Sequence, residues 1–201
     1  EVPRGGWVLS TADTRIAIDV IENRPVVRRL ESAAHSRNWM ASAGTVPLMA
    51  KIWVAGQEAA PQWLFDGAAL SANGTTLTLT FRNEQPKLVL QSIWRARPGP
   101  GPIEHWLTLE NQSGARVAVS HQDSLSLAGL NAKGAAEVWW VKRGGGNAST
   151  EGGTFVEPVN AQLNLNLVSN CDDGASPVPW LAVQAADGRG LYAGWEFSGL
   201  G

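Results

Sequence analysis

The chain has 201 residues, a formal net charge of −2 and a hydrophobic fraction of 44%, while charged residues make up only 17%. This length fits one large all-β domain or two small ones. No basic run exceeds two residues, which excludes a nucleic-acid partner and non-specific attraction to acidic membranes. A membrane helix needs about 20 consecutive apolar residues, and no apolar run in the sequence is nearly that long.

Alternation of apolar and polar residues is the dominant local signal from the N-terminus onward. Residues 15–20 alternate, residues 22–25 form a turn, and residues 26–30 supply the second strand of a predicted hairpin. The more uniformly apolar run 46–54 predicts a third strand. The 22 Gly and 11 Pro residues favour many turns and short strands over long helices.

The strongest hairpin signal is Asn73-Gly74, which lies between the segments 68–72 and 75–81. Because Asn and Gly accept positive φ angles, this dipeptide predicts a type I′ turn. In the segment that follows the turn, the leucines and the phenylalanine would face the core, and the threonines would face solvent.

The same alternation predicts strands through the rest of the chain. They cover residues 88–94, 103–109, 117–121, 137–142, 162–168, 180–185 and 191–197. The segments 33–45, 143–153 and 169–179 are predicted to be irregular. About a dozen strands without an amphipathic helix indicate an all-β domain of two packed antiparallel sheets, and we expect one such domain over residues 1–201.

The segment 179–199 carries a specific pattern of aromatic and glycine residues. It begins with Pro179-Trp180, continues through Asp187-Gly188, and ends with Gly-Trp-Glu-Phe-Ser-Gly at residues 194–199. This pattern resembles the end of the N-terminal β-sandwich of melibiase-type α-galactosidases, and residues 137–142 resemble another strand of that domain. The resemblance implies a two-sheet antiparallel β-supersandwich of the galactose-mutarotase-like kind.

The resemblance also implies a role beside a catalytic domain. In such enzymes the catalytic carboxylates lie on a (β/α)₈ barrel of roughly 250 residues that follows the sandwich. We therefore expect an N-terminal fragment of a glycoside hydrolase, without catalytic residues, cofactor or metal of its own. The expected partners are that C-terminal barrel, carbohydrate and, as an alternative, further copies of the same chain. The substrate class implies a secreted or periplasmic protein.

Carboxylates are the first candidates for chemistry, because retaining glycosidases need two carboxyl groups about 5 Å apart. The candidates are Glu104, Glu110, Asp123, Glu157 and Glu196. No local motif pairs any two of them, and solvated positions on strand faces explain each one.

Histidines raise the alternative of a mutarotase-type aldose epimerase, which needs a general acid and a general base beside the sugar ring. His105 and His121 lie on neighbouring predicted strands, and the third histidine is His35. However, His105 falls in the apolar phase of its strand, which favours a hydrogen-bonded histidine in the core.

Ten tryptophans suggest carbohydrate contact, because a flat aromatic ring packs against the C–H face of a sugar. The candidates are Trp39, Trp53, Trp63 and Asp66. They support the alternative of a free-standing carbohydrate-binding module. The competing interpretation is that these tryptophans fill a wide core between the sheets.

The single cysteine, Cys171, has no partner for an internal disulfide and no Cys or His at metal-binding spacing. The loop 170–174 offers too few oxygen ligands for calcium. The sequence therefore predicts neither a zinc nor a calcium site.

Overall fold

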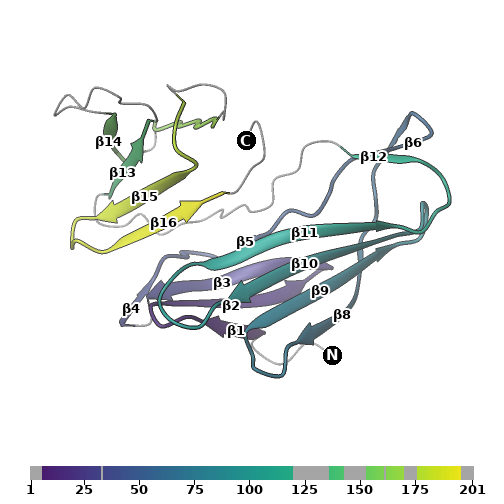
Figure 1. The fold of residues 1–201 in the computed structure, drawn as a ribbon, viewed down its shortest axis with the longest axis horizontal. Helices are drawn as coiled ribbons and strands as arrows, with labels where there is room; N and C mark the ends of the chain where they lie inside the picture. The colour runs from purple at the N-terminus through teal and green to yellow at the C-terminus, as the bar shows by residue number, and fades with distance from the viewer. Residues whose placement is uncertain are drawn as a thin grey trace. The chain divides into compact units, whose positions relative to one another are not determined.

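Extended backbone supplies all the regular secondary structure of the residues that the structure describes, which are 6–32, 34–119, 136–142, 153–160, 162–169 and 176–195. The computed structural model places sixteen strands and no helix in these ranges (Figure 1). The chain forms two compact units, Glu1–Asn131 and Ala132–Gly201. The predicted all-β class with packed antiparallel sheets is confirmed. A single domain over residues 1–201 stays a prediction.

The first sheet of the N-terminal unit comes from the alternating segments at the start of the chain. Its antiparallel strands follow the order β1 (Trp7–Ser10), β2 (Thr14–Ile21), β3 (Arg24–Ser32) and β4 (His35–Asn38), and the short β5 (Gly44–Thr45) pairs with β3. The predicted hairpin between β2 and β3 is confirmed. The segment 33–45 was predicted to be irregular but contains β4 and β5. Both pair with the edge of β3 that β2 leaves free.

The second sheet of this unit contains the longest run of regular alternation. Its order is β11 (Ile103–Asn111), β10 (Leu88–Ala96), β9 (Thr76–Asn83) and β8 (Leu64–Leu70), with all neighbours antiparallel. Every second residue of β10 is buried, and those between them are partly exposed. The sheet therefore presents one face to the core and the other to solvent, as the period of two requires.

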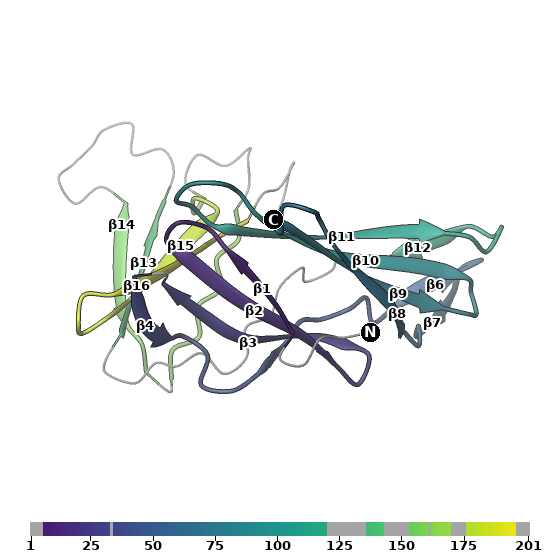
Figure 2. The same cartoon turned by 90° about the horizontal axis from the view of Figure 1, so that it is seen from below.

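The core of the N-terminal unit lies between these two sheets, whose strands β1, β9 and β10 are in contact (Figure 2). Leucine, isoleucine and aromatic side chains from both sheets fill it. The residues that are fully buried there include Leu9, Ile18, Val27, Leu77, Leu79, Phe81, Leu90 and Trp94. The predicted inward orientation of the leucines and the phenylalanine of β9 is confirmed.

Polar contacts join the two sheets just after the end of β1 and just before the start of β11. The side chain of Asp13 accepts a hydrogen bond from the backbone N–H of Gly101 at 3.0 Å, and Thr11 donates to the carbonyl oxygen of Gly101 at 3.0 Å. The hydrogen bond from Gly101, followed by that from Thr11, lowers the pKa of Asp13. The long β10–β11 connection is thereby fixed to the first sheet.

A third, small sheet closes one end of the same unit. It contains β6 (Ile52–Val54) between β7 (Gln57–Ala59) and β12 (Val117–Val119). Ile52 packs with Met49 and Leu88. The run 46–54 was predicted as one strand, but only its last three residues form β6, since only they pair with neighbouring strands.

The C-terminal unit is a four-stranded antiparallel sheet. Its order is β14 (Thr154–Pro158), β13 (Ala136–Val141), β15 (Trp180–Ala185) and β16 (Gly190–Gly194). The strand predicted at 180–185 is confirmed, and the turn at Asp187-Gly188 joins it to β16. The strand predicted at 162–168 is wrong: its leucines are partly buried in alternation, but these residues have no ladder partner in the described ranges.

The turn types also differ from the prediction. At Asn73-Gly74 only Gly74 has a positive φ, of 69°, and residues 71–75 connect β8 to β9. The Ser71 hydroxyl accepts hydrogen bonds from the N–H groups of Thr75 and Thr76 at 3.1 and 2.8 Å, which closes this wider loop. The two-residue turns with two positive φ angles lie elsewhere, at Glu22-Asn23 and Ala55-Gly56.

Candidate functional site

The solvent side of the β10–β11 hairpin carries a row of paired side chains, here called the outer row. Residues that face each other in an antiparallel ladder project to the same side of the sheet. The odd-numbered residues of β10 and the even-numbered residues of β11 therefore share the side opposite the core. Three of the four facing pairs on this side make up the outer row, namely Arg95–Glu104, Ile93–Trp106 and Gln91–Thr108.

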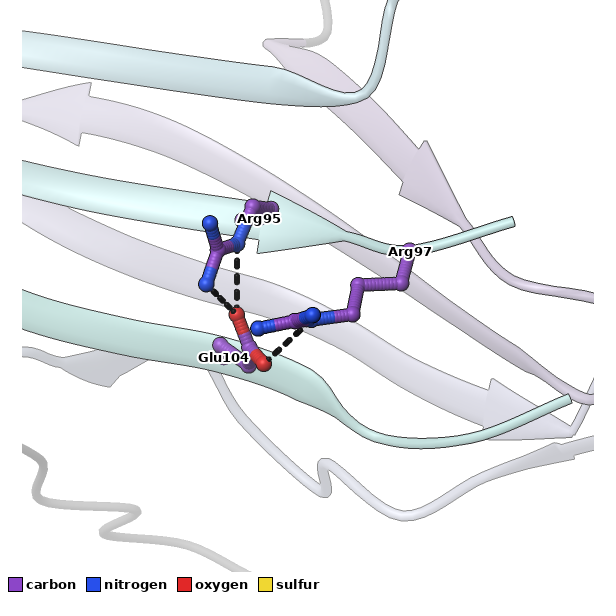
Figure 3. Close-up of polar contacts among 3 residues, drawn as sticks. All are labelled: Arg95, Arg97 and Glu104. Carbon is purple, nitrogen blue, oxygen red and sulfur yellow. Dashed lines mark hydrogen bonds and ion pairs between the residues drawn. The ribbon is translucent and has the colours of Figure 1, made fainter. Parts of the chain in front are cut away.

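One end of the outer row is a cluster of three charged side chains (Figure 3). The Nε–H groups of Arg95 and Arg97 donate to the two carboxylate oxygens of Glu104, at 2.6 and 2.7 Å. Burial raises the pKa of Glu104, but the hydrogen bonds and positive charges of Arg95 and Arg97 outweigh this effect and hold it below its usual value. Glu104 is therefore ionised at neutral pH and fixed between two guanidinium groups.

The centre of the outer row is the indole of Trp106, which is partly buried. The guanidinium carbon of Arg95 lies 5.1 Å from the centroid of this ring. This exceeds the about 3.5–4.0 Å of direct contact between carbon atoms, so the guanidinium does not lie flat on the ring centre. On the other side of Trp106, the hydroxyl of Thr108 donates to the side-chain oxygen of Gln91 at 3.2 Å.

Replacement of Glu104 by Gln is expected to lower the free energy of unfolding at pH 7 by about 0.5–1 kcal/mol, the range of partly exposed ion pairs. Since the folded-state pKa is depressed, the contribution of Glu104 is present above its ordinary pKa of 4.5 and is lost as the pH falls through the folded-state value. Urea denaturation of both proteins between pH 7 and pH 3 measures this. The difference should shrink towards pH 3, whereas a Thr78→Val control on the same face should differ from the wild type equally at every pH.

His105 belongs to the opposite, core side of the same hairpin. Its ring lies 4.0 Å from that of Trp94, between centroids, and its Nε2 lies 2.9 Å from the hydroxyl of Ser92. Ser92 also accepts a hydrogen bond from the indole N–H of Trp94 at 3.0 Å. His105 and Glu104 project to opposite faces, so they do not flank a common sugar ring as an epimerase requires. The side chain of His35 and all of His121 lie outside the described part of the structure.

The predicted carbohydrate-contact residues lie in separate environments. Trp39 is only 4% exposed. The indole N–H of Trp63 donates to the carbonyl oxygen of Met49 at 2.7 Å, and its ring packs against the cluster that contains Ile52. Trp53 projects from the other side of β6 and is partly buried.

Asp66, the fourth of these residues, lies in a bulge of β8 and forms an ion pair of 2.6 Å with Arg82. This hydrogen bond, followed by the charge of Asp66, raises the pKa of Arg82. The structure does not bring the four predicted contact residues together, and their role in binding sugar stays a prediction.

Within the described residues of the N-terminal unit, the acidic candidates give no carboxylate pair of glycosidase geometry. Glu104 and Glu110 share a face of β11, but their six-residue separation places them about 20 Å apart along the strand, against the about 5 Å of a retaining pair. Glu157 lies on β14 in the other unit. Asp123, Glu196 and the whole loop 170–174, which includes Cys171, fall outside the described ranges.

Among the described residues, no group of three His, Cys, Asp or Glu side chains could hold a metal ion. In the same ranges, no helix has the length and hydropathy that crossing a bilayer requires.

The outer row itself was missed by sequence reasoning, which singled out other tryptophans. A signal was available, because Trp106 is out of phase with the apolar residues Ile103, Leu107 and Leu109 of its strand. The pairing of Glu104 with Arg95 depends on the register of the hairpin, which the sequence leaves open. Comparisons with protein-family models and with curated proteins find no match for the chain.

Proposed function

We propose that this chain is a non-catalytic β-sandwich domain of an α-galactosidase-like glycoside hydrolase, which supports the catalytic barrel and contacts carbohydrate. The observation that carries the proposal is the environment of Glu104. A general acid in glycoside hydrolysis needs a raised pKa, whereas the pKa of Glu104 is lowered by two hydrogen-bonded arginines. This carboxylate suits hydrogen bonding to a ligand rather than proton transfer.

Carbohydrate is the proposed ligand for two reasons. The pattern at residues 179–199 resembles a domain of sugar-cleaving enzymes, and its residues 180–194 form the hairpin of β15 and β16. An aromatic ring beside fixed polar groups, as at Trp106, is an arrangement that suits sugars. The proposed partners are the barrel of a parent chain, carbohydrate and further copies of this chain, in a secreted or periplasmic setting.

The test measures binding and turnover with the same preparation of the 201-residue chain. Titration with neutral oligosaccharides, including galactose-containing ones, should change the tryptophan fluorescence in a saturable way. Incubation with p-nitrophenyl α-galactoside should release no nitrophenol above a protein-free blank. Catalysed release would overturn the non-catalytic part of the proposal. A flat titration across the panel would overturn its carbohydrate-binding part.

A free-standing carbohydrate-binding module is the second candidate, because the polar and aromatic outer row supports it equally. The coding sequence beyond Gly201 separates the two candidates. A continuation of about 250 residues with a βα repeat would support the accessory domain. A stop codon near Gly201 would leave the free-standing module.

A further inference from the structure

The outer row combines an aromatic surface with both hydrogen-bond donors and acceptors. Each arginine has five N–H donors, and a carboxylate has about four acceptor sites. In the described part of the chain, Arg97 directs one N–H group to Glu104, and Arg95 uses two nitrogens on the same carboxylate. The side chains of Arg95 and Arg97 are 41% and 65% exposed, so their other donors are open to a ligand.

The charges on this side of the sheet balance one another. Strands β8 to β11 and Arg97 carry equal numbers of carboxylates and guanidinium groups on this side: the acidic residues are Asp66, Glu104 and Glu110, and the basic residues are Arg82, Arg95 and Arg97. Two of the three carboxylates are paired directly with arginines. A polyanion would therefore meet no net positive field here. A hydroxyl group, which both donates and accepts hydrogen bonds, matches the mixed character of the charged cluster.

The row is also held in place before any ligand binds. Its backbone belongs to an unbroken ladder, in which all nine residues of β10 face a residue of β11. The other side of β10 is anchored by Leu88, Leu90 and Ser92, which are completely buried. Glu104 fixes both arginines at once. Such order reduces the side-chain entropy that binding would otherwise cost.

We propose that the outer row is the carbohydrate-binding site of this domain and that its ligand is a neutral pyranose unit of an oligosaccharide. The C–H face of the sugar packs against the exposed part of Trp106. Its hydroxyl groups bond to Arg97, Arg95 and Glu104 on one side of the ring and to Gln91 and Thr108 on the other. This assignment rests on the proposed function and specifies its site and ligand class.

The test uses the 201-residue chain and a neutral oligosaccharide chosen from a glycan array as the probe. Trp106→Ala is expected to weaken binding at least about tenfold, as the loss of an aromatic hot spot does. Trp106→Tyr, which keeps an aromatic ring, should recover part of this loss. Arg97→Ala should weaken binding about threefold or more, because its guanidinium supplies charged hydrogen-bond donors. Far-UV circular dichroism and urea midpoints establish that each variant is folded.

Two matched controls locate the effect. Arg82→Ala removes an ion-paired arginine from the same face but from the other end of the sheet, and Trp53→Ala removes a partly buried tryptophan from a different sheet. Both should bind like the wild type. If the wild type binds and Trp106→Ala binds equally well, or if Trp53→Ala loses binding instead, the site is overturned but the proposed function stands. Preference for uronic or sulfated glycans overturns the neutral ligand class. A wild type that binds no glycan overturns both proposals.

Discussion

Replacement of Trp94 by Ala is expected to lower the free energy of unfolding by about 3–5 kcal/mol, the range for removal of a large aromatic side chain from a core. Trp94 is only 2% exposed and is among the largest fully buried side chains in the described residues. The change removes three interactions together: the buried indole surface, the ring contact with His105 and the hydrogen bond to Ser92. Since small domains are stable by about 5–15 kcal/mol, this single change removes much of the total.

Urea or thermal denaturation of the purified variants measures this loss, and two substitutions calibrate it. Trp94→Phe keeps an aromatic ring but loses the N–H donor to Ser92, so its cost should be well below that of Trp94→Ala. Val8→Ala truncates a residue of β1 that is 53% exposed and should change stability by at most about 0.5 kcal/mol. A cost for Trp94→Ala as small as that of Val8→Ala would contradict the placement of Trp94 in the core.

The alternation of the sequence predicted the centre of the second sheet well, because its two central strands, β9 and β10, each bury one complete face. In β9 and β10 every second position is buried, and all the buried residues except Asn83 and Ser92 are apolar. The same reasoning failed at residues 162–168, where Leu163, Leu165 and Leu167 alternate and are partly buried. Alternation reports which side chains share a face, but a strand also needs a neighbour whose backbone groups complete its hydrogen bonds.

The candidate site was harder to predict because it depends on hairpin register. A β10–β11 hairpin centred on Pro100 would place Arg95 opposite His105 and would carry the arginine away from Glu104. The observed register is centred between Gly99 and Pro100, and it places Arg95 opposite Glu104. A shift of one residue moves a side chain to the other face, and the Pro-Gly repeat at 98–102 is compatible with either centre. Two hydrogen bonds with residues far away in sequence help to hold the observed register: Thr11 donates to the carbonyl oxygen of Gly101, and the N–H group of Gly101 donates to Asp13.

The second large effect is expected at Gly6, where the backbone leaves no room for a side chain. A Cβ atom at this position would overlap the carbonyl oxygen of Ile18 and would lie 3.0 Å from its carbonyl carbon. The residue also has a φ of 75°, a conformation that costs a non-glycine residue about 1–2 kcal/mol. Both atoms in the overlap belong to the backbone of β2, which is held in the sheet by β1 and β3 and cannot rotate away.

Gly6→Ala is therefore expected to destabilise the chain by the cost of the left-handed backbone and, in addition, by roughly 1–3 kcal/mol of overpacking. Gly56→Ala is the matched control, because Gly56 has a similar φ of 85° but no atom within 4 Å of the position that a Cβ would occupy. Only the backbone cost should remain there. Equal urea midpoints for the two variants would contradict the close approach of Gly6 to β2. Faster amide exchange at Leu9, which pairs with Ile16, would locate the additional loss in the β1–β2 ladder.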